Sequence, residues 1–244
     1  MIGRLARTAA SFGVAAGVTR AVYAGLRRRP SAGWQRTNYA GRTVDLYAGP
    51  ATAVGAAVAT GSGPAAFAVL VAGACGAYDD VRARGDERRG FRAHLEALRD
   101  GEVTSGTVKL LGVGAAGLVA GALLKERPLD KVLAGVVIAG TAHFVNLVDV
   151  APGRAALTVL GLGAPGLLRG TVAAAPMGAA AAVLADDLGE RTMLGDTGAH
   201  ALGAAVGSAI AAGNGRLGLA VHAAGLIAAA AYGSRVSDLA RSPV

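Results

Sequence analysis

The sequence predicts an all-α fold: a polytopic integral membrane bundle of about nine transmembrane helices. The first observation is composition, because 53% of the 244 residues are hydrophobic and only 16% are charged, against roughly 25% in an ordinary soluble domain. The second is a mean hydropathy of +0.47. The third is the presence of windows that approach the roughly 17 to 25 apolar residues needed to cross a bilayer. A soluble Ala/Gly-rich domain is the competing class, and it would need arginines around every helix.

Charged and glycine-rich breaks divide the apolar sequence into successive spans. The first follows a short basic start, and we interpret it as a retained span because its apolar run continues past any obvious signal-peptide cleavage site. All the spans belong to a single membrane domain, residues 1–244. The predicted spans are 8–26, 47–61, 63–78, 107–124, 131–148, 155–169, 171–186, 197–213 and 216–233.

Basic residues are distributed unevenly between the two sides that these spans define. Most of the arginines fall in segments 27–46, 79–106, 149–154 and 187–196 and in the C-terminal tail. Because cytoplasmic loops are enriched in Lys and Arg, we expect this side to face the cytoplasm in a multi-pass plasma-membrane protein, with the N-terminus outside. This orientation accounts for the net charge of +8. A nucleic-acid partner is not expected, because aromatic interleaving and a binding motif are lacking.

The basic loop 79–106 contains a candidate amphipathic helix at 86–100, DERRGFRAHLEALRD. Its Phe91, Leu95 and Leu98 recur at i, i+4 and i+7 among arginines. Such a helix can lie in the headgroup layer and attract anionic lipid. An ordinary loop helix with a solvated charged face fits the pattern equally well.

Six aspartates fall at the predicted cytoplasmic ends of spans. Ionisable groups near the bilayer are costly unless paired or hydrated, which makes them functional candidates. Carboxylates without Cys or closely spaced His suit Mg²⁺ or Mn²⁺ rather than Zn²⁺, and Mg²⁺ usually takes its other ligands from water and substrate phosphates. The pattern therefore predicts a hard-cation site for a phosphorylated substrate, and acids that only face water or neutralise arginines are the alternative. The six are Asp79, Asp80, Asp149, Asp186, Asp187 and Asp196.

Two short segments place polar groups together at these ends. In HFVNLVDV, Asn146 and Asp149 are three residues apart and share a helix face. In MLGDTGAHALGA, Asp196 lies between two glycines just before a span. The glycines allow close backbone approach, and the helix N-terminus offers N–H groups to an anion. His200, four residues after Asp196, is the histidine we would test.

These elements resemble, in order and topology, the polyprenyl-phosphate N-acetylhexosaminyl-1-phosphate transferases (glycosyltransferase family 4), of which the chain would be a shortened and divergent member. The family includes the phospho-N-acetylmuramoyl-pentapeptide transferase of peptidoglycan synthesis. The similarity lies in GAYDD at a span end, NLVD, and GDTG before a helix. The early segment RTNYAGRTVDLYAGP is similar to the family's cytoplasmic hairpin and the start of its second span. The resemblance runs from about Trp34 to Gly207.

The resemblance implies transfer of a sugar 1-phosphate, N-acetylhexosamine 1-phosphate, from a UDP-sugar to polyprenyl phosphate at the inner membrane face. UMP is released, and the product serves cell-envelope glycan synthesis. Asp196 and Asp80 would hold Mg²⁺ (or Mn²⁺), and Asp79 and Asp80 would position or deprotonate the lipid phosphate. The partners are the UDP-sugar, polyprenyl phosphate and the lipid bilayer, and a homodimer is compatible with the pattern. The candidate substrate-binding residues are Asn146, Asp149, Arg154, Asp187 and His200.

Departures from the family pattern leave other classes open. The tail YGSRVSDLARSPV has no counterpart of the family's late His-rich loop, DVAPGRAAL replaces the usual Asp-Gly with its glycine-rich run, and His143 stands where the first Asn of an Asn pair is usual. The alternative is a degenerate member that acts as a lipid-phosphate-binding scaffold or regulator in envelope assembly. A transporter is the third class, and it would need acids at mid-bilayer and broken helices in corresponding halves.

Overall fold

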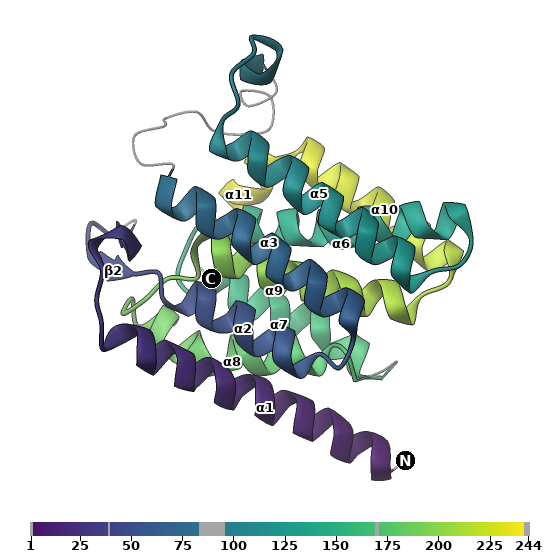
Figure 1. The fold of residues 1–244 in the computed structure, drawn as a ribbon, viewed down its shortest axis with the longest axis horizontal. Coiled ribbons are helices and arrows are strands. Elements are labelled where there is room, and N and C mark those ends of the chain that lie inside the picture. Colours follow the sequence, from purple (N-terminus) through teal and green to yellow (C-terminus); the bar gives the residue numbers. More distant parts are fainter. Residues whose placement is uncertain (1, 39, 83–95, 169–170, 242–244) are drawn as a thin grey trace.

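The computed structural model describes residues 2–38, 40–82, 96–168 and 171–241. Within these ranges the chain forms ten α-helices, one 3₁₀ turn and a two-stranded hairpin (Figure 1). The all-α prediction is confirmed. The elements are α1 (Ile2–Arg27), η1 (Ala32–Trp34), β1 (Gln35–Thr37), β2 (Thr43–Asp45), α2 (Ala48–Ala59), α3 (Gly63–Arg82), α5 (Ser105–Leu124), α6 (Pro128–Val148), α7 (Arg154–Leu167), α8 (Ala174–Leu188), α9 (Gly195–Gly213), α10 (Arg216–Ala231) and α11 (Gly233–Arg241).

Each of the nine predicted segments contains a helix, but the prediction of nine spans is wrong. In the described chain three helices, α3, α5 and α6, are long and apolar enough to cross a membrane. A fourth candidate exists if α10 and α11, bent by 82°, form one span. The helices α2, α7 and α8 have 12, 14 and 15 residues, and at 1.5 Å per residue they fall well short of a hydrocarbon core roughly 30 Å thick. The long helix α1 carries Arg4, Arg7 and Arg20, which lower its hydropathy.

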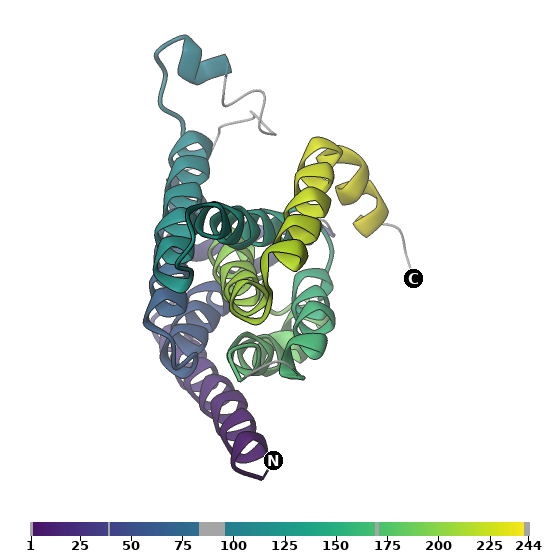
Figure 2. The ribbon, with the colours of Figure 1, turned by 90° about the vertical axis from the view of Figure 1, so that its right-hand side faces the viewer.

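The helix α9 forms the centre of the bundle, and α2, α3, α6 and α7 surround it (Figure 2). Glycines allow this close packing, because a Cβ at Gly203 would lie 2.6 Å from the Cα of Ala142 on α6. A Cβ at Gly207 would likewise lie 2.8 Å from the Cα of Ile138. Small residues at helix contacts let backbones approach without a large side-chain layer. The Ala/Gly-rich composition is therefore a packing requirement of this bundle.

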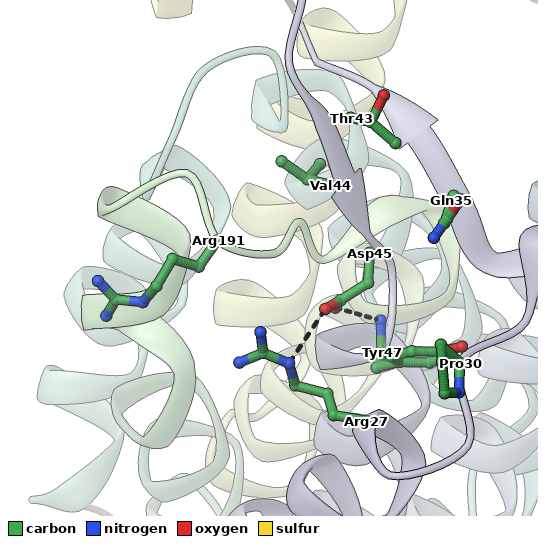
Figure 3. A pocket seen from close by; sticks show the side chains of 8 residues that line it. All are labelled: Arg27, Pro30, Gln35, Thr43, Val44, Asp45, Tyr47 and Arg191. Carbon is green, nitrogen blue, oxygen red and sulfur yellow. Dashed lines mark hydrogen bonds and ion pairs between the residues drawn. The ribbon is translucent and has the colours of Figure 1, made fainter.

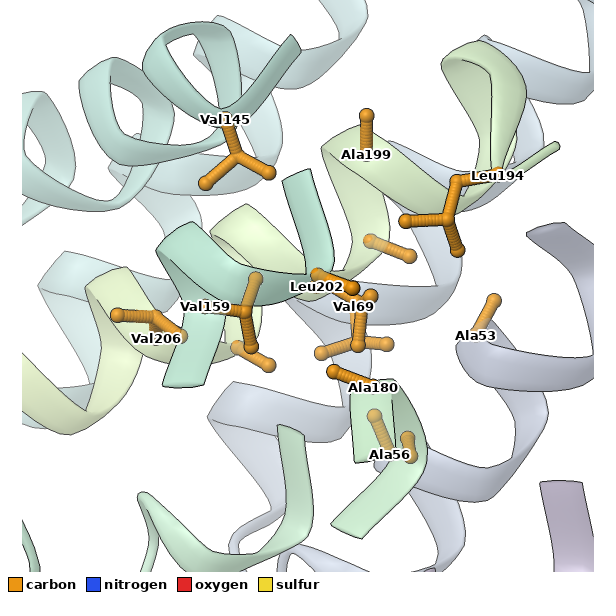
Figure 4. Close-up of a cluster of buried hydrophobic side chains, with 14 of the residues drawn as sticks. Ala53, Ala56, Val69, Val145, Val159, Ala180, Leu194, Ala199, Leu202 and Val206 are labelled. Atoms are coloured by element: carbon orange, nitrogen blue, oxygen red, sulfur yellow. The ribbon is translucent and has the colours of Figure 1, made fainter. Parts of the chain in front are cut away.

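A buried apolar cluster joins α9 to six other helices, α1, α2, α3, α6, α7 and α8 (Figure 4). Val69 of α3, Val145 of α6, Val159 of α7 and Val183 of α8 meet Leu202 of α9 there, all fully buried. Outside this core, large apolar side chains remain exposed on the outer helices. They include Leu111, Leu118 and Leu123 on α5 and Leu217, Val221 and Ile227 on α10. Extended exposed apolar surface of this kind fits a lipid-facing bundle, in agreement with the candidate spans.

The helices alternate in direction, so their ends form two opposite ends of the bundle. One end contains the C-terminal ends of α1, α3, α6 and α8 and the starts of α2, α5, α7 and α9 (left in Figure 1). We call it the acid end, because the six aspartates 79, 80, 149, 186, 187 and 196 lie there. At the opposite end Arg4 donates a hydrogen bond to the Leu167 carbonyl (3.0 Å), and Lys125 donates one to the Asn214 carbonyl (2.8 Å).

The antiparallel hairpin β1–β2 lies at the acid end, with Arg36 opposite Val44. Its turn is closed by Asn38, whose side-chain oxygen accepts hydrogen bonds from the N–H groups of Ala40 (3.0 Å) and Arg42 (2.8 Å). Asp45 at the end of β2 pairs with Thr192, in the loop between α8 and α9. The hairpin therefore supports the loop that precedes α9. Most of the predicted amphipathic helix at 86–100 lies outside the described residues.

Candidate functional site

Asp80, near the C-terminal end of α3, caps the N-terminus of α9. One carboxylate oxygen accepts the N–H of Asp196 (3.1 Å). The other accepts the N–H (2.9 Å) and the hydroxyl (2.6 Å) of Thr197. The side chain is buried, and a carboxylate at a helix N-terminus is stabilised by the free N–H groups and the helix dipole. Both oxygens of Asp80 are thus used by the protein itself.

Glycine at position 195 makes this cap sterically accessible. Its φ of +60° lies in the left-handed region, which favours glycine. A Cβ there would also lie 3.0 Å from Oδ2 of Asp80. The glycines of GDTG were expected to allow close backbone approach, and in the structure Gly195 admits the carboxylate of α3.

Lys109, in the second turn of α5, bridges the two other acids of this cluster. Its ammonium donates to Oδ2 of Asp79 at 3.0 Å and also to Oδ2 of Asp196. The lysine side chain is 20% exposed, and the two carboxylates are 16% and 23% exposed, so solvent can reach the group. Lys109 was not predicted from the sequence. The feature that could have indicated it is a single lysine near the start of the otherwise apolar segment 107–124.

A second pair of acids, Asp149 and Asp187, lies nearby. Asp187 accepts the N–H of Gly153 at 3.2 Å, which ties the end of α8 to the turn between α6 and α7. Burial raises the pKa of Asp187 to about 6, although this hydrogen bond lowers it. Burial also raises the pKa of the Asp149 carboxyl well above its usual range, and the charges of Asp187, Asp196 and Asp80 raise it further. These electrostatic interactions show that the acids of α3, α6, α8 and α9 gather in one region, as the sequence predicted.

Asp186 belongs to a different group, the contact between α1 and α8. It forms ion pairs with Arg20 of α1 and with Arg191 (2.8 Å) after α8. Burial opposes ionisation of this carboxyl, but the hydrogen bonds from Arg191 and Arg20 outweigh burial and lower its pKa. We interpret Asp186 as part of the packing of α1.

The remaining predicted substrate residues take different positions. Asn146 is half-buried in the last turn of α6, where its carbonyl accepts the N–H of Asp149 at 3.3 Å. Arg154 is the first residue of α7 and is half-buried at the acid end. His200 is buried in α9, and its Nδ1 lies 2.8 Å from the Asp196 carbonyl. A side chain in this position supports the first turn of α9 rather than facing solvent.

The carboxylates offer two ligands to a hard cation at the position of the Lys109 ammonium. Within the described ranges, no group of three or more His, Cys, Asp or Glu residues is arranged to hold a metal ion. Asp79 and Asp196 converge on one ammonium, which shows that their geometry accommodates a cation. Mg²⁺ is often held by one or two carboxylates and completed by water and phosphate oxygens. Asp79 and Asp196 fit this donor set, whereas both carboxylate oxygens of Asp80 already accept hydrogen bonds from the first turn of α9.

No family model matches the chain, and the search of curated proteins found no match. The resemblance in the motifs therefore rests on the sequence alone.

Proposed function

We propose that the protein transfers a sugar 1-phosphate, N-acetylhexosamine 1-phosphate, from a UDP-sugar to polyprenyl phosphate in a Mg²⁺-dependent reaction. One observation carries the proposal: Asp79 and Asp196, from the motifs GAYDD and GDTG, converge on Lys109 at the solvent-accessible end of a bundle with candidate membrane spans. The basic residues of the hairpin and of the α8–α9 loop border the same end. We infer from their excess that this end faces the cytoplasm.

The arrangement suits phosphoryl-type transfer, in which catalysis is mostly alignment and neutralisation of phosphate charge. Mg²⁺ held by Asp79 and Asp196 would neutralise the phosphates of the bound donor. The ammonium of Lys109 would then donate to phosphate oxygens in place of the carboxylates. Asp80 acts indirectly in this scheme, because its hydrogen bonds fix the start of α9 and so place Asp196 opposite Asp79. Asn146 and Asp149 border the site from α6 and would contact the nucleotide sugar.

The test is UMP release by purified full-length protein given polyprenyl phosphate, Mg²⁺ and a panel of UDP-sugars. We expect release that requires lipid and metal and that falls by at least about 100-fold in Asp196→Asn, a magnitude typical of removing a charged group that stabilises a transition state. Asp130→Asn is the matched control, because Asp130 pairs with Arg216 at the opposite end of the bundle (2.7 Å). If Asp196→Asn and the control are equally active, the assignment of Asp196 as a metal ligand of the transferase is refuted.

The second candidate function is a scaffold that binds lipid phosphate without turnover. The observation that favours it is the pairing of Lys109 with both acids, which gives each carboxylate a cationic partner from the protein itself. This candidate predicts that Asp79→Asn and Asp196→Asn leave the cellular phenotype intact. The scaffold function would be supported if the protein binds polyprenyl phosphate but releases no UMP from any UDP-sugar. A cooperative unfolding transition would show that the protein tested is folded.

A further inference from the structure

A cavity of about 280 Å³ lies between the C-terminal end of α1, the hairpin and the loop between α8 and α9 (Figure 3). Arg27 and Arg191 line it from two elements, and Gln35, Thr43 and Asp45 of the hairpin complete its polar wall. None of the residues that line it belongs to the Lys109 cluster, which is formed by α3, α5 and α9. The proposed transferase reaction assigns no role to these side chains.

The guanidinium of Arg27 is held in place on two sides. Its Nε lies 3.4 Å from Oδ2 of Asp45, and its Cζ lies over the Tyr23 ring, 5.3 Å from the ring centroid. Asp45 is itself fixed, because its Oδ1 accepts hydrogen bonds from the Thr192 hydroxyl (2.7 Å) and the Tyr47 N–H (3.1 Å). In the part of the chain that the structure describes, the terminal nitrogens of Arg27 make no hydrogen bond, and in Figure 3 they point away from Asp45.

Arg191 is anchored in the same manner from the other wall. Its Nε donates to Asp186 at 2.8 Å, and one terminal nitrogen donates to the Ala185 carbonyl at 3.1 Å. The side chains of Arg27 and Arg191 are nevertheless 46% and 54% exposed. The lining of the cavity therefore contains two arginines and one aspartate, and in Figure 3 the Arg191 guanidinium points away from Arg27, whose terminal nitrogens are the ones available to a ligand.

We propose that this cavity binds a phosphate group. A guanidinium anchored through Nε presents its remaining N–H groups in a fixed fork that matches phosphate oxygens, so little side-chain entropy is lost on binding. The Gln35 amide and the Thr43 hydroxyl suit the hydroxyl groups that neighbour a phosphate in a glycerol or ribose. Two sources have this chemistry, an anionic phospholipid headgroup and a nucleotide. The site does not depend on the proposed transferase reaction.

The experiment measures binding by the full-length protein in two arms. One arm measures adducts of phosphatidylglycerol by native mass spectrometry, and the other titrates UDP in the absence of Mg²⁺. We expect Arg27→Gln to weaken binding by about tenfold in one of the arms, as for the loss of one hydrogen bond to a charged group, and the arm affected identifies the source. Arg28→Gln, an exposed neighbour outside the cavity wall, is the control and should bind like the unmodified protein.

Two further variants separate the proposal from a folding defect. Asp45→Asn removes the negative charge from the wall and should strengthen binding. Thr43→Phe keeps every charge and fills the cavity, so it should abolish binding while the protein still unfolds at its usual temperature. The proposal is overturned if neither ligand binds, or if Arg28→Gln weakens binding as much as Arg27→Gln. If Asp196→Asn loses UMP release but still binds phosphatidylglycerol or UDP normally, only the transferase site is affected and the phosphate site is intact.

Discussion

Replacing Asp80 by Ala should destabilise the start of α9 and thereby the whole bundle. The change removes three hydrogen bonds to Asp196 and Thr197. Loss of an N-cap costs about 0.5 to 2 kcal/mol, and each buried donor left without a partner costs about 1 to 3 kcal/mol. We therefore expect a loss of about 3 kcal/mol. For a chain of this length, a loss of that size lowers the unfolding temperature by about 6 to 12 °C.

Thermal unfolding in detergent, followed by circular dichroism, measures this change. Asp80→Asn keeps one acceptor oxygen and should lose only about 1 kcal/mol. Asp79→Asn is the matched control, since Asp79 is the adjacent acid and Lys109 keeps Asp196 as a partner when it is replaced. An Asp80→Ala protein that unfolds at the original temperature but has lost Mg²⁺-dependent turnover would refute the reasoning, because Asp80 would then act directly on metal or substrate.

Three more predictions concern the same end of the bundle. Lys109→Met leaves the two acids that it bridges without a cation, so the unfolding temperature should fall and added Mg²⁺ should restore part of it; no response to Mg²⁺ would contradict the metal site. Gly76→Val pushes a side chain into the backbone at the start of α9 and should cost about 2 to 3 kcal/mol, whereas Gly114→Ala, with open space around it, should be neutral in the same unfolding assay. Burial raises the pKa of Asp187 to about 6, so the native state holds a proton that the unfolded chain releases, and stability falls as pH rises from about 4 to about 6. Asp187→Asn should reduce that dependence and stabilise the protein at pH 7, as urea titrations at several pH values would show.

The positions of the helices and the gathering of the acids could be predicted because both follow from patterns along the chain. Apolar runs separated by charged breaks locate helices, and an alternating path brings every second break to the same end. The number of spans could not be predicted in this way. A mostly apolar segment of Ala and Gly, such as the one that forms α9, packs inside the bundle as readily as it faces lipid, so hydropathy alone does not separate a span from a buried helix.

The partners of individual side chains at the acid end could not be predicted from the sequence either. Lys109 meets Asp79 only because α3 and α5 pack side by side, a contact between residues 30 positions apart. The pairing of Asp45 with Thr192 spans 147 positions. Periodicity describes which face of a helix is apolar, but it does not say which helix covers that face or how the two are rotated.

The adjacency of Asp79 and Asp80 has a geometric explanation. Neighbouring residues on a helix point about 100° apart and do not face the same partner. Asp80 therefore faces the N-terminus of α9, while Asp79 faces α5 and meets Lys109. By capping α9, Asp80 holds Asp196 where it shares that lysine with Asp79. The two adjacent acids thus have different partners: Asp80 caps the start of α9, and Asp79 shares Lys109 with a residue on that helix.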